Sequence, residues 1–196
     1  IAEQKMAVAI ARVQNPKIVP QNEKWTVEIY KALGQEFIDV TQHRNAVKVF
    51  QLALARFPMD RDAPRLRERV AVLYDQLARL APDGSAIRTE YTRRALEART
   101  LLAAYVGTTE WTHANRDDAE ALATAESLAK SGLQRAAADH TNQARALVGR
   151  AREASSQAAQ RNLLERAIIG YRMAEMAWAA YVAQDPAAVD SYESRF

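Results

Sequence analysis

Residues 27–60 of this chain, VEIYKALGQEFIDVTQHRNAVKVFQLALARFPMD, decide its fold. Large and small side chains recur in them at helical spacing. The positions that carry the pattern are Tyr30, Leu33, Gly34, Phe37, Ala46, Phe50, Ala53 and Pro58. Gly34 and Ala46 are small enough for two helices to approach closely, and Phe37 and Phe50 can fill the space beside them. Because proline cannot continue a helix, Pro58 ends the second one, and the stretch predicts a tightly packed helical hairpin.

These eight residues, at these spacings, resemble the tetratricopeptide repeat (TPR), a 34-residue unit of two antiparallel helices. A second, partial match lies at Ala167, Tyr171 and Ala174, without the proline expected five residues later. The resemblance implies an all-α, TPR-like α-α superhelix, a right-handed solenoid. We expect residues 1–196 to form a single helical-repeat domain, with 27–60 as the regular TPR unit and 61–196 as elongated TPR-like helices.

Hydrophobic periodicity predicts about seven antiparallel helices, the later ones unusually long. Their expected ranges are 1–14, 23–40, 44–57, 62–80, 87–107, 116–153 and 158–184. Residues 108–114 should be irregular. Whether residues 116–153 form one unbroken helix stays open, because Gly132 or Gly149 could interrupt it.

Several local signals refine these helices. Asp62 and Pro64 suit the cap and the first turn of the fourth helix, and Asn115 suits the cap of the long one. Asp75 and Arg79 are four residues apart and should pair on the surface of the fourth helix.

The helix expected at residues 158–184 has two apolar rows. The first row is Leu164, Ala167, Tyr171, Ala174, Trp178 and Tyr181, and the second is Ile168, Met176 and Val182. Since each apolar row is normally buried against a neighbour, we expect this helix to be covered on two sides.

Composition narrows the classes of protein that remain. The chain has 40 alanines, six glycines, six prolines and no cysteine among 196 residues. Few turn residues exclude an all-β fold, and the lack of cysteine excludes disulfide scaffolds, cysteine–zinc sites and thiol catalysis. The net charge is only +3, and the arginine cluster at Arg61, Arg65, Arg67 and Arg69 is interrupted by acidic residues. We therefore expect a salt-bridged surface, no nucleic-acid partner and no membrane span.

No catalytic, metal or cofactor site is expected. The three histidines, His43, His113 and His140, form no pair at helical ligand spacing, and His140 lies on an apolar row as a packing residue would. The chain contains no glycine-rich phosphate loop and no serine-hydrolase or zinc-protease motif. We therefore predict a protein that is not an enzyme.

Two candidate partner-binding features remain. The resemblance implies a concave groove lined by the first helix of each unit, here by Lys31, Gln35 and Ile38. Some TPR proteins grip a peptide carboxylate with a lysine and an asparagine in this groove; Lys31 matches the lysine, but Gln35 replaces the asparagine. A general peptide contact is expected instead, with a merely solvated Lys31 as the alternative. Trp111 is either an exposed anchor for a partner or a plug over the end of a helix pair.

The resulting functional expectation is a non-enzymatic protein–protein interaction scaffold that binds a protein or peptide in the concave groove. Its expected setting is a bacterial envelope or motility assembly, with the periplasm favoured over the cytoplasm. The alternative is a helical accessory domain of a larger, cell-wall-acting enzyme whose catalytic part lies elsewhere. Because Ile1 already lies in a helical pattern and a helix starts again at residue 187, we expect a fragment of a longer repeat protein. Its uncapped ends could self-associate.

Overall fold

The computed structural model describes residues 2–20, 23, 25–82 and 85–184. Within these ranges the chain forms eight α-helices, one short 3-10 helix and no strand, which confirms the all-α class. The elements are α1 (Ala2–Gln14), α2 (Thr26–Asp39), α3 (His43–Arg56), α4 (Ala63–Leu80), α5 (Ala86–Thr100), η1 (Leu101–Tyr105), α6 (Glu110–Ala114), α7 (Ala119–Arg152) and α8 (Gln157–Gln184).

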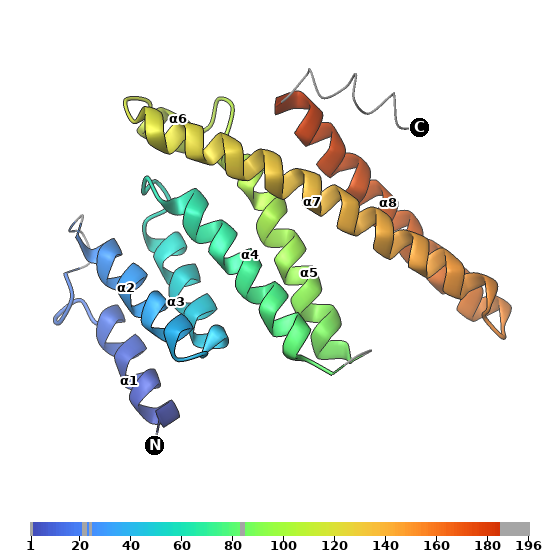
Figure 1. Ribbon diagram of the computed structural model, residues 1–196, viewed down its shortest axis with the longest axis horizontal. Coiled ribbons are helices and arrows are strands. Elements are labelled where there is room, and N and C mark those ends of the chain that lie inside the picture. The colour runs from blue at the N-terminus through green and yellow to red at the C-terminus, as the bar shows by residue number, and fades with distance from the viewer. Residues whose placement is uncertain (1, 21–22, 24, 83–84, 185–196) are drawn as a thin grey trace.

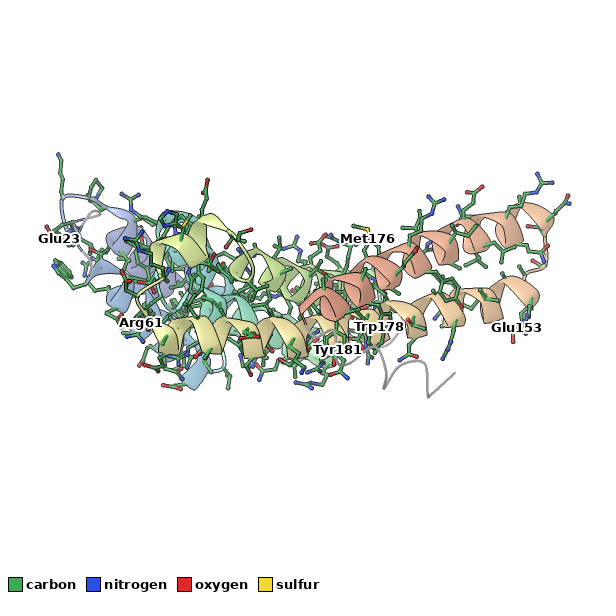
Figure 2. The ribbon with its side chains drawn as sticks, turned by 90° about the horizontal axis from the view of Figure 1, so that it is seen from above. Glu23, Arg61, Glu153, Met176, Trp178 and Tyr181 are labelled. Atoms are coloured by element: carbon green, nitrogen blue, oxygen red, sulfur yellow. The ribbon has the colours of Figure 1, made fainter. Side chains whose placement is uncertain are left out.

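The first helices lie side by side, and the last two form a long projecting hairpin (Figure 1). Helix α2 packs on α3, α3 on α4, and α4 on α5. Helix α7 packs across α4, α5 and η1, and its longest interface is with α8. Figure 2 shows the resulting elongated molecule, with Glu23 near one end and Glu153, at the tip of the hairpin, at the other.

The hairpin of α2 and α3 is held by the close contact that its sequence predicts. A Cβ atom added to Gly34 would lie 2.2 Å from a ring carbon of Phe50, so only glycine fits at this crossing. Phe37, Ala46 and Phe50 are completely buried around it. The predicted roles of these small and large residues in packing are therefore confirmed.

Replacing Gly34 with alanine should destabilise the protein by about 1–3 kcal/mol, because the new methyl group must displace the buried Phe50 ring. Gly149→Ala is the matched control: Gly149 is also helical, and an added Cβ would meet nothing within 4 Å. The control should gain about 0.5–1 kcal/mol from the higher helix propensity of alanine. Urea denaturation of both variants measures the two free energies, and equal effects would contradict the packing argument.

A buried arginine joins α4 and α5 to the long helix. The Arg99 side chain of α5 is only 1% exposed and pairs with Asp75 of α4 and, at 3.8 Å, with Asp139 of α7. Arg135 of α7 also reaches Asp75, at 3.4 Å. The surface pair expected between Asp75 and Arg79 is therefore wrong, because Asp75 is drawn to the cations of two other helices.

Glu68 lies beside this network without a direct partner. Its Oε2 atom is buried and accepts no hydrogen bond from the residues that the structure describes. Burial raises the pKa of Glu68, and the nearby Arg99 and Arg135 offset only part of this effect. The folded protein therefore favours the neutral acid of Glu68 more than the unfolded chain does.

Glu68→Gln should raise the melting temperature at pH 7, because glutamine keeps the shape without the charge. A raised folded-state pKa means that stability is lost as pH rises from the ordinary glutamate value through the folded value. The advantage of the variant should therefore shrink as the pH falls toward 4. Thermal unfolding at both pH values checks this. Glu126→Gln, at an exposed position on α7, is the control and should leave the melting temperature unchanged at either pH. A difference in melting temperature between Glu68→Gln and the parent protein that does not vary with pH would contradict the raised pKa of Glu68.

The connection between α5 and α7 differs most from the sequence-based expectation. Helix α5 ends at Thr100 and continues into the 3-10 helix η1, and Gly107 then adopts a left-handed φ of 73°. Residues 108–114 were expected to be irregular, but they contain α6, which begins with a reciprocal cap between Thr109 and Thr112. With this helix, the described residues form eight helices rather than the seven expected.

Helix α7 begins later than expected but is unbroken. The carboxylate of Asp118 accepts a hydrogen bond from the Ala121 amide at 3.0 Å, so Asp118 and not Asn115 caps the helix. The amide of Asn115 instead donates to the carbonyls of Met59 and Trp111. The helix then continues from Ala119 to Arg152 through both glycines, which answers the question left open by the sequence.

Small residues form the seam between α7 and α8. The buried residues of α8 are Ala167, Ala174 and Ala177. A Cβ atom on Gly170 would lie 3.1 Å from the Cβ of Ala144 on α7, so the two backbones lie close together. Ala177 also joins a small cluster with Leu96 of α5 and Ala136 of α7. Helices α7 and α8 therefore pack against each other through alanine rather than through large apolar side chains.

The prediction that α8 is covered on two sides is wrong for the described chain. Ile168 is 52% exposed and Met176 is 65% exposed, so most of the second apolar row faces outward. The main partner of α8 is α7, which takes up only the alanine face. The further helix expected from residue 187 lies outside the described residues.

Candidate functional site

The predicted groove residue Lys31 is held by acidic neighbours. Its amine lies 2.7 Å from Glu28, 3.4 Å from Asp60 and 2.6 Å from Asp62, and its side chain is 17% exposed. Partial burial lowers the pKa of Lys31, but its hydrogen bonds to Asp62 and Glu28 and the nearby charges together raise the pKa above the ordinary value. Lys31 therefore ties α2 to the start of α4, and Asp62 pairs with it instead of capping α4.

Gln35 and Ile38 are also engaged within the protein. The Gln35 amide donates to Asp39 at 2.8 Å and accepts from Arg69 of α4 at 3.0 Å. Ile38 is partly buried against the core. The structure thus places the three predicted residues along one side of α2, with Lys31 and Gln35 contacting α4 or the turn before it. Their role in peptide binding stays a prediction.

Trp111 is not an exposed anchor. It is 2% exposed, its indole donates a hydrogen bond to the Asp60 carbonyl at 2.8 Å, and its ring packs edge-on against Tyr105. It therefore fixes α6 against the turn that precedes α4, as the plug alternative requires.

Trp111→Ala should cost about 3–5 kcal/mol of stability, since it removes a large buried side chain and leaves a cavity. Trp25 is 49% exposed, so Trp25→Ala should change stability by no more than about 0.5 kcal/mol. Chemical denaturation of the two variants checks this difference. Similar losses at both positions would show that Trp111 is not packed as described.

The arginine cluster at the start of α4 forms a salt-bridged surface. Arg61 contacts Asp118 at 3.1 Å and Glu120 at 3.0 Å near the start of α7. Arg65 pairs with Asp62 and also reaches Glu120. The expected salt-bridged surface is therefore observed at Arg61 and Arg65, but most of their partners lie at the start of α7 and not within the cluster itself.

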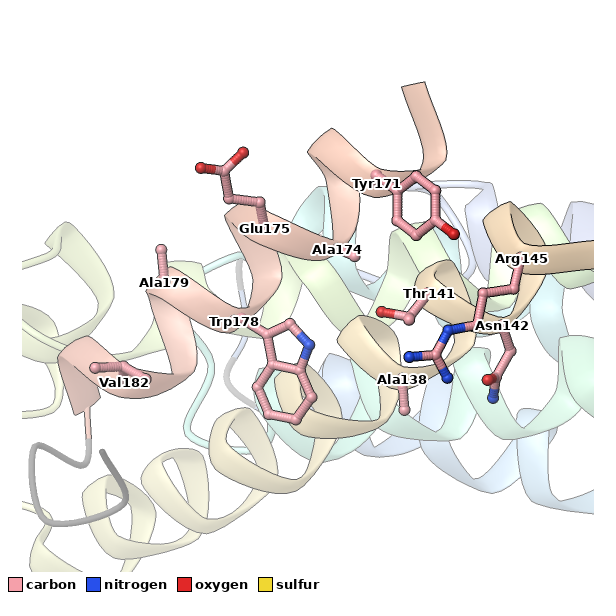
Figure 3. A pocket seen from close by; sticks show the side chains of 10 residues that line it. All are labelled: Ala138, Thr141, Asn142, Arg145, Tyr171, Ala174, Glu175, Trp178, Ala179 and Val182. Atoms are coloured by element: carbon pink, nitrogen blue, oxygen red, sulfur yellow. The ribbon is translucent and has the colours of Figure 1, made fainter. Parts of the chain in front are cut away.

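A groove with a volume of about 650 Å³ lies between α7 and α8. Helix α8 contributes Tyr171 and Trp178 to its lining, and α7 contributes Ala138 and Arg145. Figure 3 shows the Trp178 indole between the two helices near Ala138, with Tyr171 and Arg145 across from each other. Trp178 also stacks edge-on against Tyr181, with 5.8 Å between ring centroids. The aromatic rings therefore form one wall of the groove.

Polar groups line the opposite wall, on α7. Thr141, Asn142 and Arg145 follow Ala138 at helical spacing, and Arg145 has no ion pair among the described residues. The hydroxyl of Thr141 donates to the carbonyl of Ala137 at 2.8 Å. Sequence reasoning missed this wall because its residues form no apolar row. The only sequence feature that pointed to the groove was a pair of aromatic residues on α8, Tyr171 and Trp178, which are seven residues apart.

A second groove, of about 700 Å³, lies between α5, α7 and α8. Its apolar lining includes Leu96, Ile169 and Met173, and His140 lines it from α7. Burial lowers the pKa of His140, so its neutral form is favoured. His140 is thus half-buried at the edge of the core, close to the packing position expected of it.

No group of histidine, aspartate or glutamate side chains in the described ranges is arranged to hold a metal ion. Nor does any described helix have the length and hydrophobicity needed to cross a bilayer. Comparisons with profiles of known protein families, with curated proteins and with solved structures found no significant match to this chain.

Proposed function

We propose that this chain is a non-enzymatic protein–protein interaction scaffold whose partner binds in the groove between α7 and α8. The observation that carries the proposal is the groove itself, which presents Tyr171 and Trp178 opposite Arg145, a cation with no ion pair in the described part of the chain. Aromatic residues and arginine dominate the binding energy of protein interfaces, because they combine large apolar area with directional contacts. The groove is open along the hairpin, so it suits an elongated ligand.

The partner that fits this groove is an amphipathic helix or an extended peptide with one acidic side chain. Its apolar face would cover the aromatic wall, and its carboxylate would pair with Arg145. The small side chains of Ala138 and Ala174 leave room for an aliphatic side chain between the walls.

We further propose that α2 to α5 are two consecutive units of a TPR-like superhelix that carries the hairpin. The support is the tight crossing of Gly34 and Phe50 and the spacing of 37 residues between the starts of α2 and α4. The partner surface would then lie beyond the regular units, on the elongated pair, rather than beside Lys31.

Site-specific photocrosslinking can test the proposed function. A photoreactive phenylalanine placed at Asn142, an exposed groove residue, should crosslink in extracts of the source cells to a defined partner segment. The same probe at Leu80, which is 73% exposed at the end of α4, is the control and should not label that segment.

Tyr171→Ala and Arg145→Glu should each weaken binding of a peptide made from the crosslinked segment by about 10–100-fold. Isothermal titration calorimetry measures this, with Trp25→Ala as a variant that should bind like the parent. Labelling of the same proteins from Asn142 and Leu80, or unchanged affinity in both groove variants, would contradict the proposed function.

A further inference from the structure

The outer face of α8 carries large apolar side chains that the described chain leaves uncovered. Ile168 and Met176 are 52% and 65% exposed, and Ile169, at the edge of the groove between α5, α7 and α8, is 61% exposed. Figure 2 shows Met176 on the side of α8 that faces away from α7, whereas Trp178 and Tyr181 lie on the side toward it. Large apolar side chains exposed on one side of a helix are typical of interaction sites in soluble proteins.

Charged residues frame this apolar centre symmetrically. Glu165 and Arg172 are seven residues apart and therefore share one face of the helix. The point midway between them falls between Ile168 and Ile169. Both charged side chains are exposed, and neither forms an ion pair with another described residue.

We propose that the outer faces of α8 from two copies of this chain pair antiparallel, across a two-fold axis that passes between Ile168 and Ile169. The axis brings the isoleucines of both copies together at the centre of the interface. It also places Glu165 of each copy level with Arg172 of the other, because the two positions are equally distant from the axis.

Charge decides the direction of pairing. In a parallel pair each Glu165 would face a second Glu165 and each Arg172 a second Arg172, and like charges across an interface are strongly unfavourable. The antiparallel pair replaces both repulsions with two attractive contacts. They lie about 10 Å apart along the helix, given a rise of 1.5 Å per residue.

A second copy explains this surface better than an unrelated partner does. The same face of α8 carries the acid, the base and the isoleucines, so each copy can contribute Glu165 to one ion pair and Arg172 to the other, as an isologous two-fold interface requires. The inference goes beyond the proposed function, because it uses the outer face of α8 and not the groove lined by Trp178. It also replaces the expected contact between solenoid ends with a contact along the side of the hairpin.

Sedimentation equilibrium of the full chain over a concentration series, with charge-swapped variants, tests the proposal. The parent protein should show a monomer–dimer equilibrium. Arg172→Glu and Glu165→Arg should each weaken the dimer by at least about tenfold, because each places like charges across the axis. The double variant, with both charges exchanged, should recover the dimer. Arg150→Glu, an exposed position on α7, makes the same charge change as Arg172→Glu and should leave the dimer unaffected.

Circular dichroism should show unchanged helix content in all variants, since both side chains are exposed and form no ion pair with the residues that the structure describes. A parent protein that is monomeric at every concentration would overturn the proposal and assign the face to another partner. A dimer that survives both single reversals would place the contact elsewhere. Single variants that dissociate without recovery in the double variant would overturn the antiparallel axis.

Discussion

The close alanine contact between α7 and α8 is the constraint from which the functional surfaces of this protein follow. Ala167 and Ala174 are 2% and 4% exposed, and Gly170 lets the backbone of α8 approach Ala144. When two helices meet through such small residues, their larger side chains cannot enter the seam and must lie beside it or face outward. Trp178 and Tyr171 therefore flank the seam in a groove, and Ile168 and Met176 face away from α7.

The first helices place this hairpin rather than form the site. The contact of Gly34 with Phe50 locks α2 to α3, and successive helices continue the packing to α5. Arg99 then connects α5 to two other helices, because its buried guanidinium pairs with Asp75 of α4 and with Asp139 of α7. Removing one member of such a buried network leaves an uncompensated charge, so the network tolerates few other arrangements.

Local patterns predicted most helices and the packing inside the first hairpin, because spacing alone places Gly34 beside Phe50. They did not predict contacts between residues that lie far apart in the sequence. The indole of Trp111 donates a hydrogen bond to the carbonyl of Asp60, and Asp75 pairs with Arg99 rather than with its neighbour Arg79. The second apolar row of α8 was visible in the sequence, but periodicity does not show what covers a face. The groove on α7 was missed because Arg145 and its neighbours are polar.

Thiol reactivity along α8 tests the orientation of this helix most directly, since the chain has no cysteine of its own. Single variants Ala174→Cys and Met176→Cys would be labelled with a maleimide at low protein concentration. The alanine seam predicts slow labelling at position 174, which faces α7, and labelling at least about tenfold faster at the exposed position 176. Equal rates, or faster labelling at position 174, would show that α8 does not pack on α7 through its alanines.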